Sequence, residues 1–218
     1  MSPRGTGTRA IRKPVIVLAG EDQNDRRCMR TVIEALCPDA RGRIVEINTQ
    51  VRLRQAGPAL AGRVQKLVDV AVAKAKQEDS PLSAFFVHED YDAVDCDERH
   101  KMRARVQETL AGRFANSFYV LATWEIEAWL LLFPDALSAT RKGWAVPQRY
   151  LGRDTARVED PKRVLTQEVS RNGPKYRESD AVEILAKAVA LNLISNPQGR
   201  NGSWQEFTAA IESITPTG

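Results

Sequence analysis

Residues 83–92 read Ser83-Ala-Phe-Phe-Val-His-Glu-Asp-Tyr-Asp92, an apolar run that ends abruptly in acidic residues. The four apolar residues at 84–87 lie between Pro81 and a group of charges, which predicts a short buried strand. Asp90 and Asp92 would then emerge at its C-terminal end, where open α/β sheets place their functional sites. Two carboxylates separated by one residue can be directed at one divalent cation, and hard oxygen ligands suit Mg²⁺ or Mn²⁺. The stretch therefore predicts a metal site, with a solvated acidic turn as the alternative.

A second apolar run, Pro14-Val-Ile-Val-Leu-Ala-Gly20, predicts a central parallel strand that begins with proline and ends at glycine. Glu21, Asp22 and Asp25 follow it at once and precede a helix that Pro38 stops. Acids at this position have two interpretations. They cap the helix and interact favourably with its N-terminus, or they belong to the same site as Asp90.

Strands and helices are predicted to alternate along the first 122 residues. Further strands are expected at 43–47 and 117–122, and helices at 60–75 and from about 97 to 112. Such alternation predicts a mostly parallel four-stranded sheet with helices on both faces. After the last strand, residues 123–133 are apolar nearly all round, which predicts a buried helix with Thr123 as its N-cap.

The chain changes character after residue 133. Residues 134–160 contain scattered proline, glycine and charge and predict a long excursion with little regular structure. Helices are then expected from Asp160, through 182–189, and from Trp204 to Ile214. We therefore expect a flexible basic arm at 1–13, an α/β core at 14–133, and a helical C-terminal extension at 134–218 packed on the core.

Composition bounds the class of protein. At 218 residues and 43% hydrophobic content the chain can bury a core, and its net charge of +4 fits a polyanionic partner. No apolar run has the length of a membrane span, and the N-terminus lacks the apolar centre of a signal peptide. Three cysteines without pair spacing favour a reducing, cytoplasmic location. The absence of a Walker A pattern or nucleophile elbow argues against nucleotide hydrolysis and acyl transfer by this chain alone.

With acids after both Gly20 and His88, the layout resembles the Toprim domain of topoisomerases, primases and OLD-type nucleases. The resemblance implies that Mg²⁺ is held by a glutamate after the first strand and by the D-x-D of Asp90 and Asp92. In the Toprim pattern the glutamate precedes a glycine, whereas here Glu21 follows it. This departure keeps Asp22 and Asp25 as alternatives to Glu21.

The chain is more closely similar to a Toprim-like family of unknown function that is found beside ATPases in bacterial defence and mobile-element loci. The matching motifs, besides residues 88–92, are Glu125-Ile-Glu-Ala-Trp-Leu130, Asp160-Pro-Lys-Arg163 and Pro174-Lys-Tyr176. The resemblance implies a Mg²⁺-dependent nuclease acting on DNA or RNA, with a separate ATPase subunit as partner. It is compatible with a homo-oligomer.

Under this hypothesis each candidate residue has a role. Asp90 and Asp92 are the principal metal ligands, Glu21 is a ligand or orients the attacking water, and Glu127 is a further ligand, with Glu125 as its alternative. Lys162 steadies the scissile phosphate or is a solvated lysine at a helix start. Contacts to backbone phosphates are assigned to Arg163, Lys175 and Arg177. Two other hypotheses remain open. The protein is an inactive Toprim-like binding or regulatory subunit, or its acidic residues have structural roles only.

Overall fold

The computed structural model describes residues 13–215, so the predicted basic arm, except for Lys13, lies outside the described residues. Its centre is a four-stranded, all-parallel sheet of strand order β2-β1-β3-β4. The strands are β1 (Val15–Ala19), β2 (Ile44–Glu46), β3 (Leu82–Asp90) and β4 (Ser117–Ala122). All five residues of β1 are buried, as expected for a central strand covered on both faces. The predicted four-stranded α/β sheet is confirmed.

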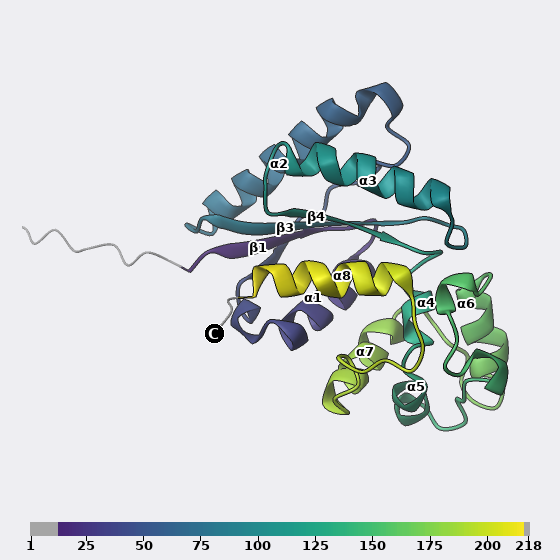
Figure 1. Ribbon diagram of the computed structural model, residues 1–218. Coiled ribbons are helices and arrows are strands. Elements are labelled where there is room, and N and C mark those ends of the chain that lie inside the picture. The colour runs from purple at the N-terminus through teal and green to yellow at the C-terminus, as the bar shows by residue number, and fades with distance from the viewer. Residues whose placement is uncertain (1–12, 216–218) are drawn as a thin grey trace, which may run out of the picture.

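Helices cover both faces of the sheet (Figure 1). One face carries α2 (Leu60–Gln77) and α3 (Asp97–Ala111), and the other carries α1 (Gln23–Leu36) and α8 (Gly202–Ile214). Alternate residues of β1 serve the two layers, because successive side chains of a strand point to opposite faces. Val17 belongs to the apolar cluster under α2 and α3, whereas Ile16 and Leu18 belong to the cluster that includes α1 and α8.

A capping box starts α1. The Asp22 side chain accepts a hydrogen bond from the backbone N–H of Asp25 (2.8 Å), and the Asp25 carboxylate accepts one from the N–H of Asp22 (3.3 Å). The helix ends at Leu36, and one residue, Cys37, separates it from the short 3₁₀ helix η1 (Pro38–Ala40). The capping interpretation is therefore confirmed for Asp22 and Asp25, although Asp25 keeps a second contact described below.

The predicted helix over residues 123–133 was wrong in extent. Only α4 (Glu127–Leu130) is helical, and Trp124 adopts a left-handed conformation with φ of 57°. Thr123 is not the N-cap; its backbone N–H donates to Ser203 Oγ at 3.0 Å. The apolar pattern arises because the segment is buried against α8 and against helices later in the chain, and tertiary burial does not require a helix.

The excursion predicted for 134–160 was partly wrong, because α5 (Pro134–Thr140) begins at Pro134 itself. The rest of this segment has only the short turns η3 (Gln148–Tyr150) and η4 (Thr155–Arg157). The predicted helix start at Asp160 is confirmed, since its side chain accepts from the N–H of Arg163 at 2.9 Å. The elements that follow are α6 (Pro161–Val164), the π-helical η5 (Leu165–Val169) and α7 (Asp180–Ala190).

The segment from α4 to α7 forms a lobe beside the carboxyl ends of the strands, and α8 then returns to the sheet (Figure 1). An aromatic group joins lobe and sheet: the Trp129 ring stacks on Phe207 of α8 with centroids 5.4 Å apart, and Phe207 meets Phe86 of β3 edge-on. This contact fixes the residues after β4 against the sheet. Of the helices that the structure describes, none is long and apolar enough to span a membrane.

Candidate functional site

Acidic side chains from three separate connections meet at the carboxyl edge of the sheet. They line a small cavity of about 100 Å³. The lining includes Asp25 from the start of α1, Asp90 at the end of β3, and Glu125 and Glu127 after β4, with Lys162 from α6. Parallel strands place their carboxyl ends along one edge, and these connections converge there for that reason. The structure thus brings together three residues to which the sequence analysis gave roles, Asp90, Glu127 and Lys162, and three that it kept as alternatives, Asp22, Asp25 and Glu125.

His88 lies behind this cavity, fully buried, with a carboxylate on either side. Its Nδ1 lies 3.4 Å from Asp25 Oδ2, and its Nε2 lies 3.5 Å from Asp90 Oδ1. Neither contact has hydrogen-bonding geometry for the imidazole, so the interaction is one of charge. Burial disfavours the imidazolium, but Asp25, Asp90 and Glu21 more than offset it and raise the pKa of His88 to about 9. His88 therefore supplies a fixed positive charge inside an acidic site.

Asp25 and Asp90 flank the same imidazole but differ in their other partners. Burial raises the pKa of Asp25, but His88 outweighs this effect, with help from the N–H of Asp22 and the charge of Arg26, so the pKa of Asp25 is lowered. Asp90 Oδ1 is buried without a hydrogen-bond partner among the described residues. Burial and the charges of Asp25, Glu21 and Glu127 raise the pKa of Asp90 well above the ordinary range, despite His88. Asp90 is thus a carboxyl group that lines the cavity, faces His88 and accepts no hydrogen bond through Oδ1 from the described residues.

Glu127 is the second buried carboxyl group. Its Oε1 accepts a hydrogen bond from the Tyr176 hydroxyl at 2.9 Å. Burial, helped by the charge of Glu125, raises the pKa of Glu127 to about 7, although Lys162 and Tyr176 act in the opposite direction. A carboxyl group that titrates near neutrality can both accept and return a proton at physiological pH.

Lys162 bridges two acids. Its Nζ lies 2.9 Å from Glu125 Oε2 and 3.0 Å from Glu178 Oε1, and its backbone N–H donates to Glu125 Oε1 at 3.1 Å. Burial lowers its pKa, but the hydrogen bonds to these two carboxylates outweigh that effect and raise it. Lys162 is therefore held at the cavity as a charged, paired ammonium group.

Glu21 and Asp92 do not line the cavity. Glu21 accepts the backbone N–H of Asp90 at 3.4 Å and lines a neighbouring hollow together with Arg54, and burial raises its pKa. Asp92 has a left-handed backbone with φ of 61°, is 65% exposed in its side chain, and pairs with Arg54. The turn after β3 therefore directs Asp90 and Asp92 to different surroundings, because the left-handed residue reverses the chain at this point.

The predicted phosphate contacts lie outside the cavity. Arg163, Lys175 and Arg177 are exposed, and Arg163 pairs with Asp160 at 3.6 Å. Arg177 lines a shallow hollow beside Lys162.

Three contributions escaped the sequence analysis: the charge of His88, the hydroxyl of Tyr176, and Arg54. Tyr176 stands in the Pro174-Lys-Tyr176 motif, so a signal for it existed. His88 stood in the predicted site, but nothing in the sequence showed that Asp25 would reach it. Arg54 gave no signal, since its partner lies 38 positions away.

The carboxylate oxygens that line the cavity are chemically suited to a hard divalent cation. Within residues 13–215 no group of three or more His, Cys, Asp or Glu side chains is arranged to hold a metal ion. Mg²⁺, however, keeps several of its waters and commonly takes only one or two protein carboxylates. The unpartnered Oδ1 of Asp90, with Asp25 and Glu127 on the same cavity, supplies donors of that kind.

Comparison of the chain with protein-family models, with curated proteins and with solved structures gives no match.

Proposed function

We propose that this protein is a Mg²⁺-dependent nuclease of Toprim-like fold that hydrolyses phosphodiester bonds of DNA or RNA. The observation that supports it most directly is Asp90, a carboxyl group at the end of a central strand that lines an acidic cavity and whose buried Oδ1 faces His88 but accepts no hydrogen bond from the described residues. A buried polar atom without a partner costs free energy, and a site-bound cation with its water would remove that cost.

Asp90 is the principal ligand in this proposal, with Asp25 and Glu127 as further carboxylates that line the same cavity. When bound, Mg²⁺ supplies charge stabilisation at the phosphate and acidifies a water molecule. His88 holds Asp25 and Asp90 in place through charge attraction from both ring nitrogens. Glu127, with its pKa near 7, accepts the proton of the attacking water. Lys162 contributes positive charge at the cavity wall toward the scissile phosphate.

Glu21 and Asp92 act at the rim in this proposal, where Glu21 accepts the N–H of Asp90 and Asp92 orients Arg54. A separate ATPase subunit as partner and a cytoplasmic location complete the proposal, and both rest on the resemblance of the motifs. Exposed Arg163, Lys175 and Arg177 remain proposed contacts to backbone phosphates.

A second candidate is a binding or regulatory subunit without cleavage. The observation that favours it is that protein cations already face the acids: His88 lies between Asp25 and Asp90, and Lys162 pairs with Glu125. In such a site the internal positive charges replace the metal rather than assist it.

The test is cleavage of plasmid, single-stranded DNA and RNA by the purified protein in Mg²⁺, Mn²⁺ or EDTA, alone and with its ATPase partner. Asp90→Asn removes the charge of the proposed ligand at nearly constant shape. Asp69→Asn, at an exposed position of α2, is the matched control. The nuclease proposal expects metal-dependent cleavage that Asp90→Asn abolishes and Asp69→Asn retains. Absence of cleavage under all these conditions, with the protein folded, favours the regulatory subunit.

A further inference from the structure

The loop between β2 and α2 stands beside the acidic cavity and is hollowed on both sides. One hollow, of about 320 Å³, lies toward α2, and the other, of about 340 Å³, lies toward the ends of β1 and β3. Residues 50–52 line both. Four basic side chains border the pair of hollows, and we name them the basic track: Arg52, Arg54, Arg63 and Lys66.

Most of the charge of the basic track is uncompensated. Within residues 13–215 no carboxylate forms an ion pair with Arg52, Arg63 or Lys66, and all three are exposed. Arg63 Nη1 donates to the backbone oxygen of Arg52 at 2.7 Å. The Gln50 amide, oriented so that its oxygen faces Arg52, accepts from Nη2 at 2.6 Å and Nε at 3.0 Å. These contacts orient the guanidinium groups without neutralising them.

The backbone that carries the track is anchored to the sheet. The buried Glu89 carboxylate of β3 accepts hydrogen bonds from the N–H groups of Leu53 (2.9 Å) and Arg54 (3.2 Å). Val51 and Leu53 are buried in the core under α2. A loop that is fixed before a ligand arrives loses less entropy on binding, so its arginines are preorganised for an anion.

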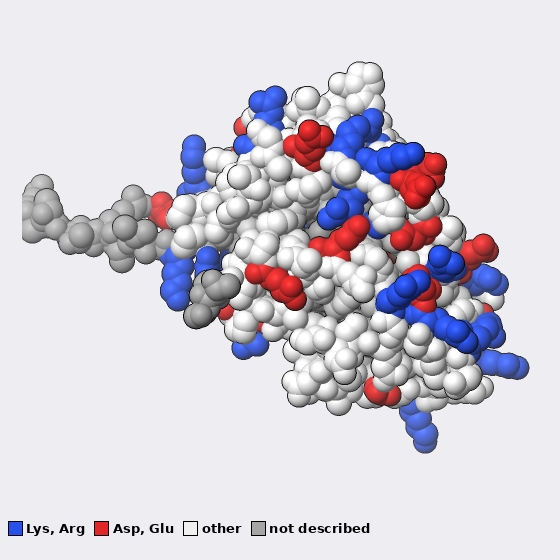
Figure 2. Space-filling view, in the orientation of Figure 1, with Lys and Arg blue, Asp and Glu red and all other residues white. Residues whose placement is uncertain are grey.

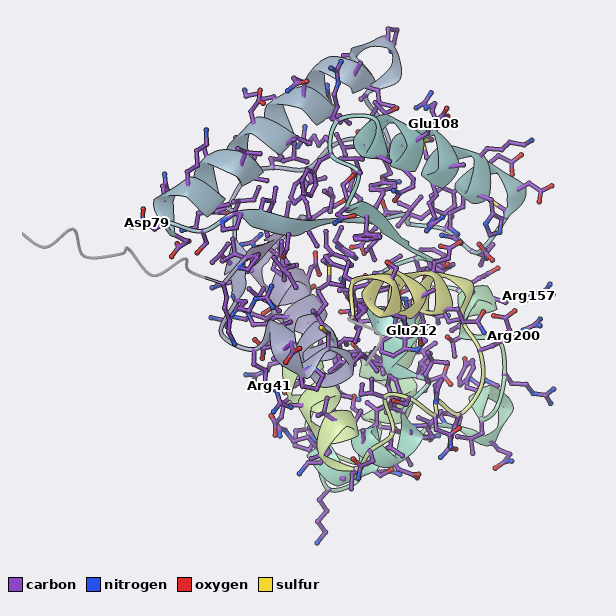
Figure 3. All side chains as sticks on the ribbon, turned by 60° about the vertical axis from the view of Figure 1, so that its left-hand side comes forward. Arg41, Asp79, Glu108, Arg157, Arg200 and Glu212 are labelled. Carbon is purple, nitrogen blue, oxygen red and sulfur yellow. The ribbon has the colours of Figure 1, made fainter. Side chains whose placement is uncertain are left out.

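Several basic residues near the carboxyl edge of the sheet are paired with acids. Lys162 pairs with Glu125 and Glu178, and Arg157 and Arg200, which project from the same edge in Figure 3, both contact Asp154. On the face drawn in Figure 2, blue and red side chains lie interspersed rather than as one field of a single sign. The basic track is therefore a stronger candidate for an anionic ligand than these paired positions.

The track also leads to the proposed site. Arg54 lies at its inner end, where its Nη1 donates to the backbone oxygen of Tyr91 at 2.8 Å and its Nη2 pairs with Asp92. Glu21 lines the same hollow as Arg52 and Arg54 and accepts the N–H of Asp90. A phosphate chain lying along the track would thus reach the edge of the cavity that contains Asp90.

We propose that the basic track binds the phosphodiester backbone of a polynucleotide, independently of base sequence, and guides it to the acidic cavity. Arginine suits this task because its planar guanidinium donates two parallel hydrogen bonds to phosphate oxygens. The inference deepens the proposed nuclease function and rests on it for the identity of the polyanion.

The experiment is fluorescence anisotropy with a labelled mixed-sequence 20-nucleotide single strand, as DNA and as RNA, in EDTA so that binding is read without cleavage. Arg52→Gln/Arg63→Gln removes two track charges. The control Arg41→Gln/Arg105→Gln removes two exposed arginine charges elsewhere on the protein. We expect the track variant to weaken binding at least tenfold at low salt, while the control stays within about twofold of the wild type.

Salt dependence provides a second readout. Loss of two phosphate contacts to a single strand should reduce the slope of log K against log salt by about 1.4. Unchanged affinity and slope in the track variant, or an equal loss in the control, would overturn the inference. Inorganic phosphate is added at constant ionic strength as a further arm, and displacement of the oligonucleotide by millimolar phosphate would assign the track to small phosphate ions instead. Because these measurements need no metal, they separate failure of the track from failure of the nuclease proposal, which the cleavage assay reports.

Discussion

The hydroxyl of Tyr119 on β4 donates a 2.8 Å hydrogen bond to the buried carboxylate of Glu89 on β3. The same carboxylate oxygen accepts two backbone N–H groups from the loop that carries the basic track. Burial and the charge of Glu89 raise the pKa of Tyr119 well above its usual range, so that the phenol remains a donor at all ordinary pH values. The Glu89 carboxylate thus connects β3, β4 and the loop of the basic track. Loss of its contacts should affect both the stability of the protein and the binding of the anion by the track.

Tyr119→Phe should lower the free energy of unfolding by about 1.5–3 kcal/mol, since it removes a hydrogen bond to a buried charged group. Urea denaturation followed by circular dichroism measures this change. The control Tyr150→Phe removes a longer, half-buried bond of 3.3 Å to Glu168 and should cost less. Equal losses of unfolding free energy in the two variants would show that the buried hydrogen bond to Glu89 contributes no more to stability than the half-buried one to Glu168.

Glu127 should make stability depend on pH. Its pKa is raised from 4.5 to about 7 in the folded protein, so the native state binds more protons than the unfolded chain between these values. Stability from this group is therefore fully present below pH 4.5 and is lost as pH rises to 7, by as much as about 3 kcal/mol at ~1.4 kcal/mol per pH unit.

The measurement for Glu127 is a comparison of unfolding free energies from pH 5 to pH 8 in the wild type and in Glu127→Gln. The variant keeps an acceptor for Tyr176 but does not ionise, so its stability should fall less over this range. A wild type and variant with parallel pH profiles would contradict the raised pKa.

His88→Gln should destabilise the protein by about 3–5 kcal/mol, because removal of one partner leaves buried acids without their counter-charge. Asp25 and Asp90 would then face each other across a neutral side chain. If the cavity accepts a cation, Mg²⁺ should raise the melting temperature of the variant more than that of the wild type. Thermal unfolding in EDTA and in Mg²⁺ gives the melting temperatures of the wild type and the variant. A monovalent salt of matched ionic strength, free of Ca²⁺, is the control. A variant as stable as the wild type would show that His88 does not stabilise the buried acids through its charge.

Asp90→Asn and Asp92→Asn should differ in cleavage, although the sequence presents them as a pair. Asp90 lines the cavity, whereas Asp92 is mostly exposed and pairs with Arg54. We expect Asp90→Asn to reduce the rate at least 100-fold and Asp92→Asn by no more than about tenfold. Rates measured under single-turnover conditions in Mg²⁺ decide this, and equal losses would show that both carboxylates act on the metal.

Local pattern predicted the sheet of this protein well. The apolar runs at 14–20 and 84–87 became β1 and the centre of β3, because strands buried on both faces of a parallel sheet are rich in apolar residues. β3 is longer than predicted and includes His88, Glu89 and Asp90. The regular apolar spacing of 60–75 became α2 for the corresponding reason. The Asp160-Pro start of α6 was likewise readable from its own residues.

The same reasoning failed where burial came from other parts of the chain. The segment after Thr123 is apolar because α6, α7 and α8 bury it, so an apolar pattern predicted a helix longer than α4. The pair Asp90 and Asp92 was predicted to converge, but the left-handed backbone at Asp92 sends the two side chains apart.

The sequence by itself determined the four strands and the helices of the α/β core, and it placed acids after three of the strands, because these features depend on neighbours a few positions away. Only the tertiary structure decided which acids meet. It put His88 between Asp25 and Asp90, brought Tyr176 to Glu127, and anchored the arginine-bearing loop on Glu89. These are contacts between distant segments, and their geometry follows from how the whole chain packs.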